Sequence, residues 1–295
     1  MELGEFLDRA ARVLARAEAW LPPVPEPVDW AATPAARWRP HPAGGGHLEA
    51  ITRPDPVRLS DLRGVDDAVE RLVRNTEQFL AGAPANNALL WGARGTGKSS
   101  LIKGLLTAYR ERGLRLVEVD KADLVHLPAI VEGLAEAPFR FLVFCDDLSF
   151  DADERGYKAL KVALDGSLAA PPANVLIHAT SNRRHLMPED MAENRQARMV
   201  DGEIHPAEAT DEKIALSERF GLWVPFHPFS QEEYLAAVDH WLLHHGLTPD
   251  EATHEEALRF ALERGSRSGR VAAQFARDRA GRAALPGEDG TGPRP

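Results

Sequence analysis

The sequence has one cysteine and no long hydrophobic run. Cys145 stands alone among 295 residues, so no disulfide can form within the chain and nothing indicates an oxidising compartment. No stretch of 18 apolar residues occurs, and so no membrane-spanning helix is predicted. Residues 1–20 mix charged and apolar side chains and lack the apolar core of a signal peptide. We therefore expect a cytoplasmic protein without a membrane partner.

Positive charge is in short supply as well. The chain has 35 Lys and Arg against 45 Asp and Glu, a formal net charge of −10 at pH 7. A protein that binds nucleic acid on its own neutralises phosphates with clustered Lys and Arg. The acidic balance therefore disfavours that class without excluding a local basic patch. The apolar fraction of 44% is ordinary for a globular protein.

The first 56 residues differ in composition from the rest. Apolar residues recur at helical spacing through residues 3–20, which predicts an amphipathic helix. Residues 21–56 then hold many prolines and three consecutive glycines, so we predict a linker or wrapping arm without regular elements. Its tryptophans, Trp30 and Trp38, indicate that this arm packs on the rest of the protein.

Strands and helices alternate through residues 57–227. Apolar runs predict strands at residues 87–91, 114–119, 139–145 and 174–180. Helical patterns lie around them, at residues 66–80, 98–110, 123–137 and 157–168. Such alternation is typical of a parallel sheet joined by crossover helices. The predicted fold is therefore α/β, with a parallel sheet sandwiched by helices.

The pattern changes again near residue 228. No further strand is indicated, and three helices are predicted at residues 231–245, 251–264 and 270–284. The last residues are rich in Gly and Pro and are predicted to be disordered. We thus predict four parts, listed in chain order: an N-terminal helix and arm (1–56), an α/β domain (57–227), a helical domain (228–284) and a tail (285–295).

A glycine-rich loop follows the first strand of the α/β domain. Residues 92–99 fit the pattern G-x-x-x-x-G-K-[ST], in which glycines let successive N–H groups turn inward toward phosphate oxygens. Lys98 would reach the β- and γ-phosphates of a nucleotide, and the Ser99 hydroxyl would ligate Mg²⁺. The strand before the loop and the helix after it favour this interpretation over a chance match. The predicted phosphate-binding residues are Gly92, Ala93, Arg94, Gly95, Thr96, Gly97, Lys98, Ser99 and Ser100.

Two carboxylates end the most apolar strand. Asp146 and Asp147 follow the run at residues 139–145, and a carboxylate at the tip of a strand beside the loop is where Mg²⁺ is held. We predict that Asp146 holds the metal and that Asp147 orients or deprotonates the attacking water. The alternative is a turn-forming Asp-Asp pair. Because the two aspartates follow Lys98 along the chain, the turn is the weaker interpretation.

These residues resemble the AAA+ superfamily of oligomeric ATPases, over roughly residues 57–283. In that family a polar sensor ends the next strand, and Asn182 stands at that place. An arginine finger precedes the helical lid, and Arg219 in the stretch LSERFG fits it. The lid carries a second sensor arginine, for which Arg270 is favoured and Arg267 is the reserve.

The resemblance also implies an adenine site, an assembly and a lid. The segment at residues 61–65, with Gly64 and Val65, is similar to the one that packs on adenine. The helical domain would close over ATP and Mg²⁺, and Arg219 would enter the site of a neighbouring copy in a ring or helical array. A homo-oligomer is therefore the implied state. Stretches at residues 146–150, 181–186 and 219–223 further resemble an uncharacterised bacterial family of predicted ATP-binding proteins, which names no client.

One residue departs from the AAA+ pattern. The family usually has Glu where this chain has Asp147, whose side chain is one methylene shorter, and a retreat of about 1 Å can cost on the order of 100-fold in rate. We therefore expect slow basal hydrolysis that depends on assembly.

Three functions remain open from the sequence. The first is an ATPase that remodels or loads an unknown protein or nucleic-acid client. The second is a nucleotide-gated binding module in which hydrolysis is incidental. The third is a P-loop kinase, which is disfavoured because the C-terminal region is predicted to form three helices. Residues 119–126 lack the aromatic pore loop of protein-threading rings, which argues against an unfoldase. A zinc site at His240, His244 and His245 would need further ligands, so a solvated helix is favoured there.

Overall fold

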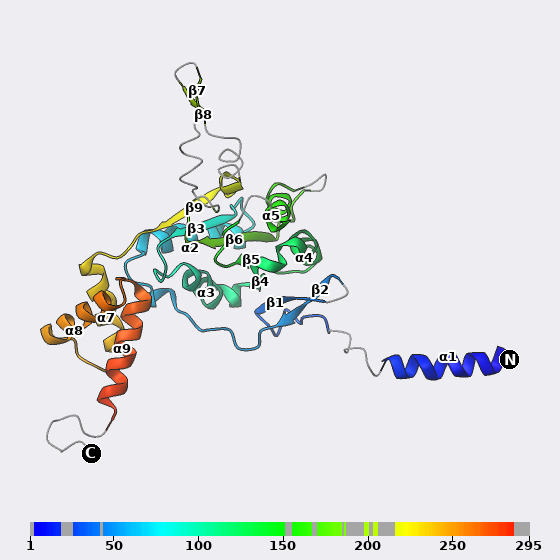
Figure 1. Ribbon diagram of the computed structural model, residues 1–295, viewed down its shortest axis with the longest axis horizontal. Helices are drawn as coiled ribbons and strands as arrows, with labels where there is room; N and C mark the ends of the chain where they lie inside the picture. The colour runs from blue at the N-terminus through cyan, green and yellow to red at the C-terminus, as the bar shows by residue number, and fades with distance from the viewer. Residues whose placement is uncertain are drawn as a thin grey trace.

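The computed structural model describes residues 3–18, 26–41, 44–150, 155–166, 170–184, 186, 198–200, 203–205 and 216–285. Figure 1 shows a central sheet with helices on both faces and a separate group of three helices near the C-terminus. The predicted tail at residues 285–295 lies outside the described residues except for Leu285.

The central sheet has seven strands in the order β2-β1-β4-β5-β6-β3-β9. All neighbouring pairs are parallel except β1 with β2, which confirms the predicted parallel α/β sheet. The strands are β1 (Ala35–Pro40), β2 (Gly46–Ala50), β3 (Ala88–Gly92), β4 (Leu114–Glu118), β5 (Arg140–Cys145), β6 (Val175–Ser181) and β9 (Leu222–Phe226). A separate antiparallel pair consists of β7 (Arg198–Val200) and β8 (Glu203–His205).

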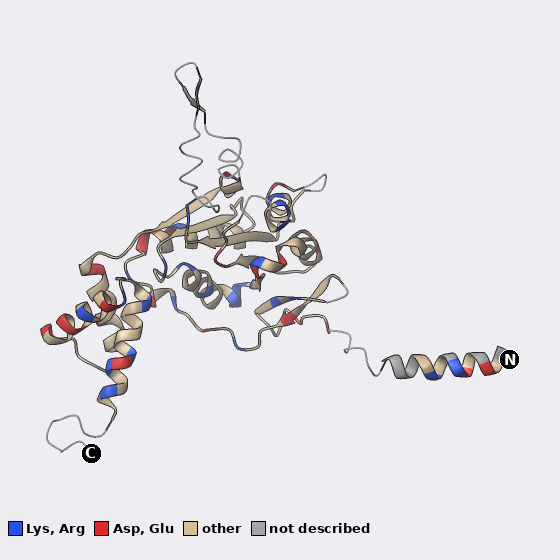
Figure 2. Cartoon of the chain, in the orientation of Figure 1, with Lys and Arg blue, Asp and Glu red and all other residues tan. Residues whose placement is uncertain are grey.

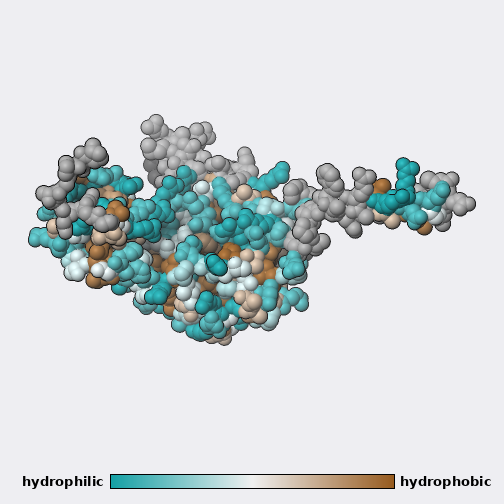
Figure 3. Space-filling model, turned by 90° about the horizontal axis from the view of Figure 1, so that it is seen from below, coloured by the Kyte–Doolittle hydropathy of each residue, from teal (hydrophilic) through white to brown (hydrophobic). Residues whose placement is uncertain are grey.

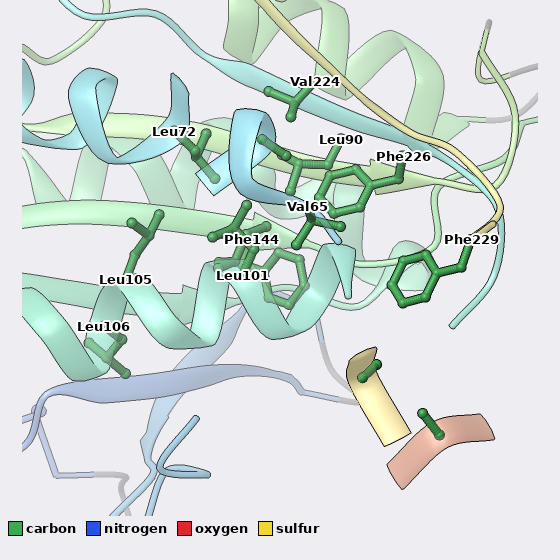
Figure 4. Close-up of a cluster of buried hydrophobic side chains, with 14 of the residues drawn as sticks. Val65, Leu72, Leu90, Leu101, Leu105, Leu106, Phe144, Val224, Phe226 and Phe229 are labelled. Atoms are coloured by element: carbon green, nitrogen blue, oxygen red, sulfur yellow. The ribbon is translucent and has the colours of Figure 1, made fainter. Parts of the chain in front are cut away.

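Helices cover both faces of the sheet. On one face lie α2 (Asp66–Leu80) and α3 (Lys98–Tyr109), whose Leu72, Leu101 and Leu105 join Leu90 and Phe144 in one core (Figure 4). On the other lie α4 (Leu127–Leu134) and α5 (Arg155–Asp165), which pack on a second core. Alternate residues of β5 serve the two cores, because strand side chains point to opposite faces in turn. Both faces of β5 are therefore apolar, as its continuous run predicts.

The helix predicted at residues 123–137 is wrong in its first turns. The chain there forms a short 3₁₀ helix, η3 (Lys121–His126), and α4 begins only at Leu127. Pro128 occupies the first turn of α4, where its missing N–H costs nothing, and it could not sit deeper in a longer helix. Two further 3₁₀ turns are η1 (Leu59–Asp61) and η2 (Arg110–Arg112).

The prediction of an arm without regular elements is also wrong. Within residues 21–56, β1 and β2 form a hairpin, and β1 adds to the sheet by pairing in parallel with β4. The prolines mark the ends of the strand instead of interrupting it, since Pro34 precedes β1 and Pro40 closes it opposite Gly46. The packing of the tryptophans is confirmed. Trp38 is buried, and the ring of Trp30 lies edge-on to Phe141 at 4.9 Å.

Three helices follow β9: α7 (Gln231–His244), α8 (Glu251–Glu263) and α9 (Gly269–Ala283). Ser230 starts α7 with a capping box, in which its hydroxyl accepts from the Glu233 N–H at 3.1 Å and its own N–H donates to the Glu233 carboxylate at 2.7 Å. Acidic residues of α7 and α8 and basic residues of α9 show as red and blue in Figure 2, and Arg282 pairs with Glu256 at 2.6 Å.

The N-terminal helix α1 (Leu3–Glu18) lies apart from the sheet in Figure 1. No helix in the described part of the chain combines the length and the apolar character that crossing a membrane needs. Hydrophilic colours cover most of the surface in Figure 3, with apolar residues in small groups.

Candidate functional site

Two glycines of the loop have neighbouring residues so close that no side chain would fit at either position. At Gly92, which ends β3 with φ of +129°, a Cβ atom would come within 2.0 Å of the Phe226 carbonyl oxygen on β9. At Gly95, with φ of +76°, a Cβ atom would approach the Ser268 hydroxyl to 2.8 Å. The loop is thus enclosed by the sheet on one side and by the start of α9 on the other.

Lys98 is buried at the first position of α3. Its ammonium donates to the carbonyl oxygens of Gly92 and Ala93, both at 2.8 Å, and to Asn182 Oδ1 at 3.1 Å. Burial lowers the pKa of Lys98 to about 8, while the carboxylates of Asp147 and Asp146 oppose that shift. The lysine therefore stays mostly charged at neutral pH, with its charge directed to the inside of the loop.

Polar groups from three adjacent strand ends meet beside Lys98. The Ser99 hydroxyl donates to Asp146 Oδ1 at 2.7 Å, and the Asn182 amide nitrogen donates to the Asp147 carboxylate. Because β5, β6 and β3 are neighbours and parallel, their carboxyl ends lie at one edge of the sheet. The structure thus brings together Lys98 and the predicted Ser99, Asp146, Asp147 and Asn182.

Arg270 joins this edge from the helical domain. Its backbone N–H donates to the Gly95 carbonyl at 3.0 Å, so the first turn of α9 rests on the loop. Its side chain is exposed and lines a cavity with a volume of about 540 Å³. The reserve candidate, Arg267, lines a different cavity on the outer side of the loop. The main cavity is lined by Asp61, Leu62, Arg63, residues 94–100, Asp146, Asp147, Thr180, Asn182, Phe229, Ala237, Trp241, Gly269, Arg270 and Ala273.

Four predicted binding residues do not line the main cavity. Gly92 and Ala93 begin the loop, and their carbonyl oxygens accept hydrogen bonds from Lys98. Val65 is buried in the core, and Gly64 lies beside it with φ of +71°. In the segment expected to pack on adenine, Asp61, Leu62 and Arg63 are the residues that reach the cavity.

A polar network joins η1 to α7 at the far end of the cavity. His240 Nδ1 lies 3.2 Å from an Arg63 guanidinium nitrogen, and His240 Nε2 lies 3.3 Å from Asp61 Oδ1. A guanidinium only donates, so Nδ1 of His240 accepts this hydrogen bond. Trp241 follows on the same helix, lines the cavity and meets the His240 ring edge-on at 5.2 Å. His240 therefore does more than sit on a solvated face. In the described ranges, no group of three or more His, Cys, Asp or Glu is placed to hold a metal.

The structure does not bring Arg219 to this edge. Arg219 lies just before the start of β9, and its guanidinium donates to Asp165 Oδ2 at 2.6 Å. Since β9 runs parallel to β3, Arg219 lies at the amino end of the strands and the loop at their carboxyl end. A five-residue strand is about 16 Å long, so the two are separated by at least that distance along the sheet.

Thr180 is a further residue at this site, and no sequence pattern predicted its place there. Its hydroxyl donates to Asp146 Oδ1 at 2.5 Å and accepts from the Asp147 backbone N–H at 2.8 Å. The residue lies inside a strand predicted from its apolar run, so it was treated as part of that run. Strand alternation offers one signal, because residues two apart point to the same side and Thr180 precedes Asn182 by two.

Comparison with known proteins identifies the family. Residues 31–283 match the family described as "Protein of unknown function (DUF815)", and the chain belongs to it. No curated protein matches the sequence.

Solved structures identify the fold. Two variants of RuvB from Thermotoga maritima superpose with TM-scores of 0.51 and 0.50, each at 15% identity over 75% of this chain and 64% of theirs. The FIGL-1 AAA domain in complex with ADP gives 0.49 at 17% identity, over 76% of this chain and 73% of that one. The fold is that of AAA+ ATPases, and the chain spans less than two thirds of the RuvB length it matches.

Proposed function

We propose that this protein binds ATP with Mg²⁺ in the cavity between the sheet and the C-terminal helices and hydrolyses it when assembled. The observation that carries the proposal is the meeting of Lys98, Ser99, Asp146, Asp147 and Asn182 at one edge of the sheet. The α/β part at residues 57–227 would bind the phosphates, and the helical part at residues 228–284 would act as a lid.

The cavity suits a nucleotide in size and chemistry. Its volume of about 540 Å³ lies within the range of small-molecule sites. One end offers the loop and the start of α3, where backbone N–H groups and the helix dipole favour phosphate. The other end offers the apolar Leu62 and Ala237 and the indole of Trp241, which suit a base.

The donor set also fits Mg²⁺, which prefers oxygen ligands. The Ser99 hydroxyl and the Asp146 carboxylate lie 2.7 Å apart at the phosphate end, and we assign the metal to these two groups, with Asp146 acting through water. Held by Ser99 and Asp146, a Mg²⁺ ion would neutralise charge on the phosphates.

The remaining residues have distinct tasks. Lys98 and Arg270 place positive charge at the phosphates. Asp147 accepts a hydrogen bond from water and takes its proton as the water oxygen attacks the γ-phosphorus and the bond to the β–γ bridging oxygen breaks. Asn182 contacts both Lys98 and Asp147. It therefore sets the distance between the ammonium that binds the phosphates and the carboxylate that acts as the base. The shorter reach of Asp147 supports slow turnover.

Arg219 would act in a neighbouring copy. It lies a strand length from the loop of its own chain, and a charged group that stabilises the transferring phosphate is worth several kcal/mol. A head-to-tail contact between copies, closing into a ring or extending as a helical array, would place it there. Its pairing with Asp165 would hold the guanidinium ready at that surface.

The work that ATP drives is proposed at a coarser level. We favour an ATPase that remodels or loads an unknown protein or nucleic-acid client, with a nucleotide-gated oligomeric module as the alternative. A small-molecule kinase is disfavoured, because the C-terminal part of the chain forms three helices, the last of which rests on Gly95 of the loop.

Light scattering coupled to size exclusion, with and without ATP, tests the proposal when combined with a phosphate-release assay. We expect larger assemblies with ATP and a hydrolysis rate per subunit that rises with protein concentration. Asp147→Asn should trap ATP in the assembly under the favoured function and change little if hydrolysis is incidental. A wild-type protein that neither binds ATP nor assembles would contradict the proposal.

A further inference from the structure

The turn after β5 is held in place by the end of β6. The last paired residues of these strands are Cys145 and Ala179, so Asp146 and Thr180 come next, side by side. The Leu148 N–H donates to the Thr180 carbonyl at 2.7 Å, and the Ser181 hydroxyl donates to the Leu148 carbonyl at 2.7 Å. The backbone that carries both carboxylates is therefore fixed by a neighbouring strand.

Thr180 adds a side-chain bond to each carboxylate residue. The hydroxyl is buried, with 1% of the residue exposed, and it carries one proton. An N–H can only donate, so the bond with Asp147 uses an oxygen lone pair of Thr180. The proton must then go to Asp146, whose Oδ1 accepts it.

Three donors converge on one oxygen of Asp146. They are the hydroxyls of Ser99 and Thr180 and the backbone N–H of Asp147, and all three reach Oδ1. In the portion of the chain that is described, no hydrogen bond reaches Oδ2. The carboxylate is thus oriented through one oxygen while the other stays available for a metal-bound water.

The same hydroxyl fixes the backbone of Asp147. This residue has φ of +49°, in the left-handed region, which is unfavourable for a residue other than glycine. The bond from its N–H to Thr180 holds that conformation, and its side chain then lies against Asn182. Without the hydroxyl, the N–H would retain only the weaker 3.1 Å contact to Asp146.

We propose that Thr180 is a positioning residue that presets both carboxylates, Asp146 toward Mg²⁺ and Asp147 toward the attacking water. This role rests on the proposed function. In it, one hydroxyl couples Asp146, the metal ligand, to Asp147, the base. Thr180 lines the cavity, and its hydroxyl is taken up by its bonds to Asp146 and Asp147. It acts through the two aspartates, in the way that outer partners orient the ligands of metal sites.

The test compares Thr180→Val, which keeps the shape and removes the hydroxyl, with Thr180→Ser, which keeps the hydroxyl. Thr76→Val is the matched control, because Thr76 is also fully buried and its hydroxyl bonds only to Leu72 in α2, away from the cavity. The probe is a fluorescent ATP analogue, with equilibrium binding titrated against Mg²⁺. Steady-state kcat and KM are measured in parallel, and circular dichroism and Tm check folding.

For Thr180→Val we expect the Mg²⁺ concentration at half-maximal enhancement of binding to rise about tenfold, and kcat to fall about 10- to 100-fold. Binding without Mg²⁺ should stay within about twofold, since the phosphate contacts of Lys98 remain. Thr180→Ser and Thr76→Val should match the wild type in both measurements. A merely structural role would lower Tm without shifting the Mg²⁺ midpoint.

The assignment is overturned if folded Thr180→Val keeps the wild-type Mg²⁺ midpoint and kcat, or if Thr180→Ser is as impaired as Thr180→Val. Should Thr180→Val fail to fold, Thr180→Ala removes the same hydroxyl without adding bulk and decides by the same criteria. A wild-type protein that lacks Mg²⁺-dependent nucleotide binding would overturn the proposed function together with this assignment, whereas the variant outcomes above leave the proposed function standing.

Discussion

The two edges of the central sheet have different chemistry. At the carboxyl edge, Lys98, Ser99, Asp146, Asp147 and Asn182 form one connected network across three strands. At the amino edge, before β9, Arg219 forms an ion pair with Asp165, and that site has no glycine-rich loop. Under the proposed function, the first edge would supply phosphate, metal and water contacts, and the second would supply a cation to a neighbouring copy.

This difference separates binding from turnover. The residues that we propose to hold the nucleotide lie within one chain, so we expect binding to need no partner. The charge that stabilises the transferring phosphate would come from another copy, so fast hydrolysis needs assembly. Changes at the carboxyl edge should alter ATP affinity or chemistry in every subunit, whereas changes at the amino edge should alter only the rate of assemblies.

The largest effect should come from Lys98→Ala. Its ammonium is the charge inside the loop, so we expect ATP affinity to fall more than about 100-fold, a loss of roughly 3 kcal/mol for a charged hydrogen-bond donor. Isothermal titration measures it. Lys103→Ala is the control on the same helix, since Lys103 does not line the cavity and its ammonium pairs with Asp55. Equal ATP affinity in the two variants would show that the carboxyl edge does not bind ATP through Lys98.

Asp147→Asn should separate chemistry from binding at the same edge. The amide cannot take a proton from water, so we expect kcat to fall about 1,000-fold while the ATP dissociation constant changes less than about threefold. Single-turnover hydrolysis and equilibrium binding give the two quantities. A loss of affinity as large as the loss of rate would mean that Asp147 holds the nucleotide and is not the base.

Arg219→Ala should act only through assembly. We expect ATP affinity to stay unchanged and the rate of assembled protein to fall about 100-fold, the size of effect for one lost charge-stabilising group. Asp165→Ala removes the partner of Arg219 and leaves the guanidinium in place, so it should retain most of the rate. Rates measured over a range of protein concentrations test both variants, and an unchanged rate in assembled Arg219→Ala would exclude the role in trans.

Trp241→Ala tests the base end of the cavity. Stacking of a base on an aromatic ring is worth about 1–3 kcal/mol, so we expect roughly tenfold weaker ATP binding with little change in kcat. Leu243→Ala, on the exposed side of the same helix, should bind ATP normally. If tripolyphosphate lost affinity as much as ATP did, Trp241 would be supporting the fold of the lid and not the base.

The smallest effect concerns the core between the two edges. His178 on β6 is fully buried, and burial lowers its pKa to about 3 from an ordinary value of 6.5. Between these values the unfolded chain binds a proton that the folded chain does not. The free energy of unfolding should therefore fall as pH drops below 6.5, by up to about 1.4 kcal/mol per pH unit.

Urea unfolding of the wild type and His178→Leu at pH 7 and pH 5 measures this contribution. The variant should lose less stability over that interval, and ATP binding at pH 7 should be unaffected. An equal loss in both proteins would show that acid sensitivity arises elsewhere.

The sequence predicted those features that depend on short-range patterns. Continuous apolar runs predicted β4, β5 and β6, and the glycine spacing predicted the loop before α3. The hairpin of β1 and β2 was missed, because Pro40 and the glycines near residue 45 mark a turn equally well in a loop or between strands. Thr180 and Trp241 were missed because their positions at the cavity depend on strand register and on how α7 meets η1, and neither relation is local in sequence.

One measurement tests the central claim most directly: phosphate release by mixtures of Lys98→Ala and Arg219→Ala. The first variant cannot bind ATP but keeps its arginine, and the second binds ATP but lacks the arginine, so each alone should be inactive. In a one-to-one mixture, about a quarter of head-to-tail contacts pair an ATP-competent site with an intact arginine. We therefore predict recovery to about a quarter of the wild-type rate. Activity that stays at the sum of the two variants at every ratio, in assemblies that light scattering shows to be mixed, would contradict the account.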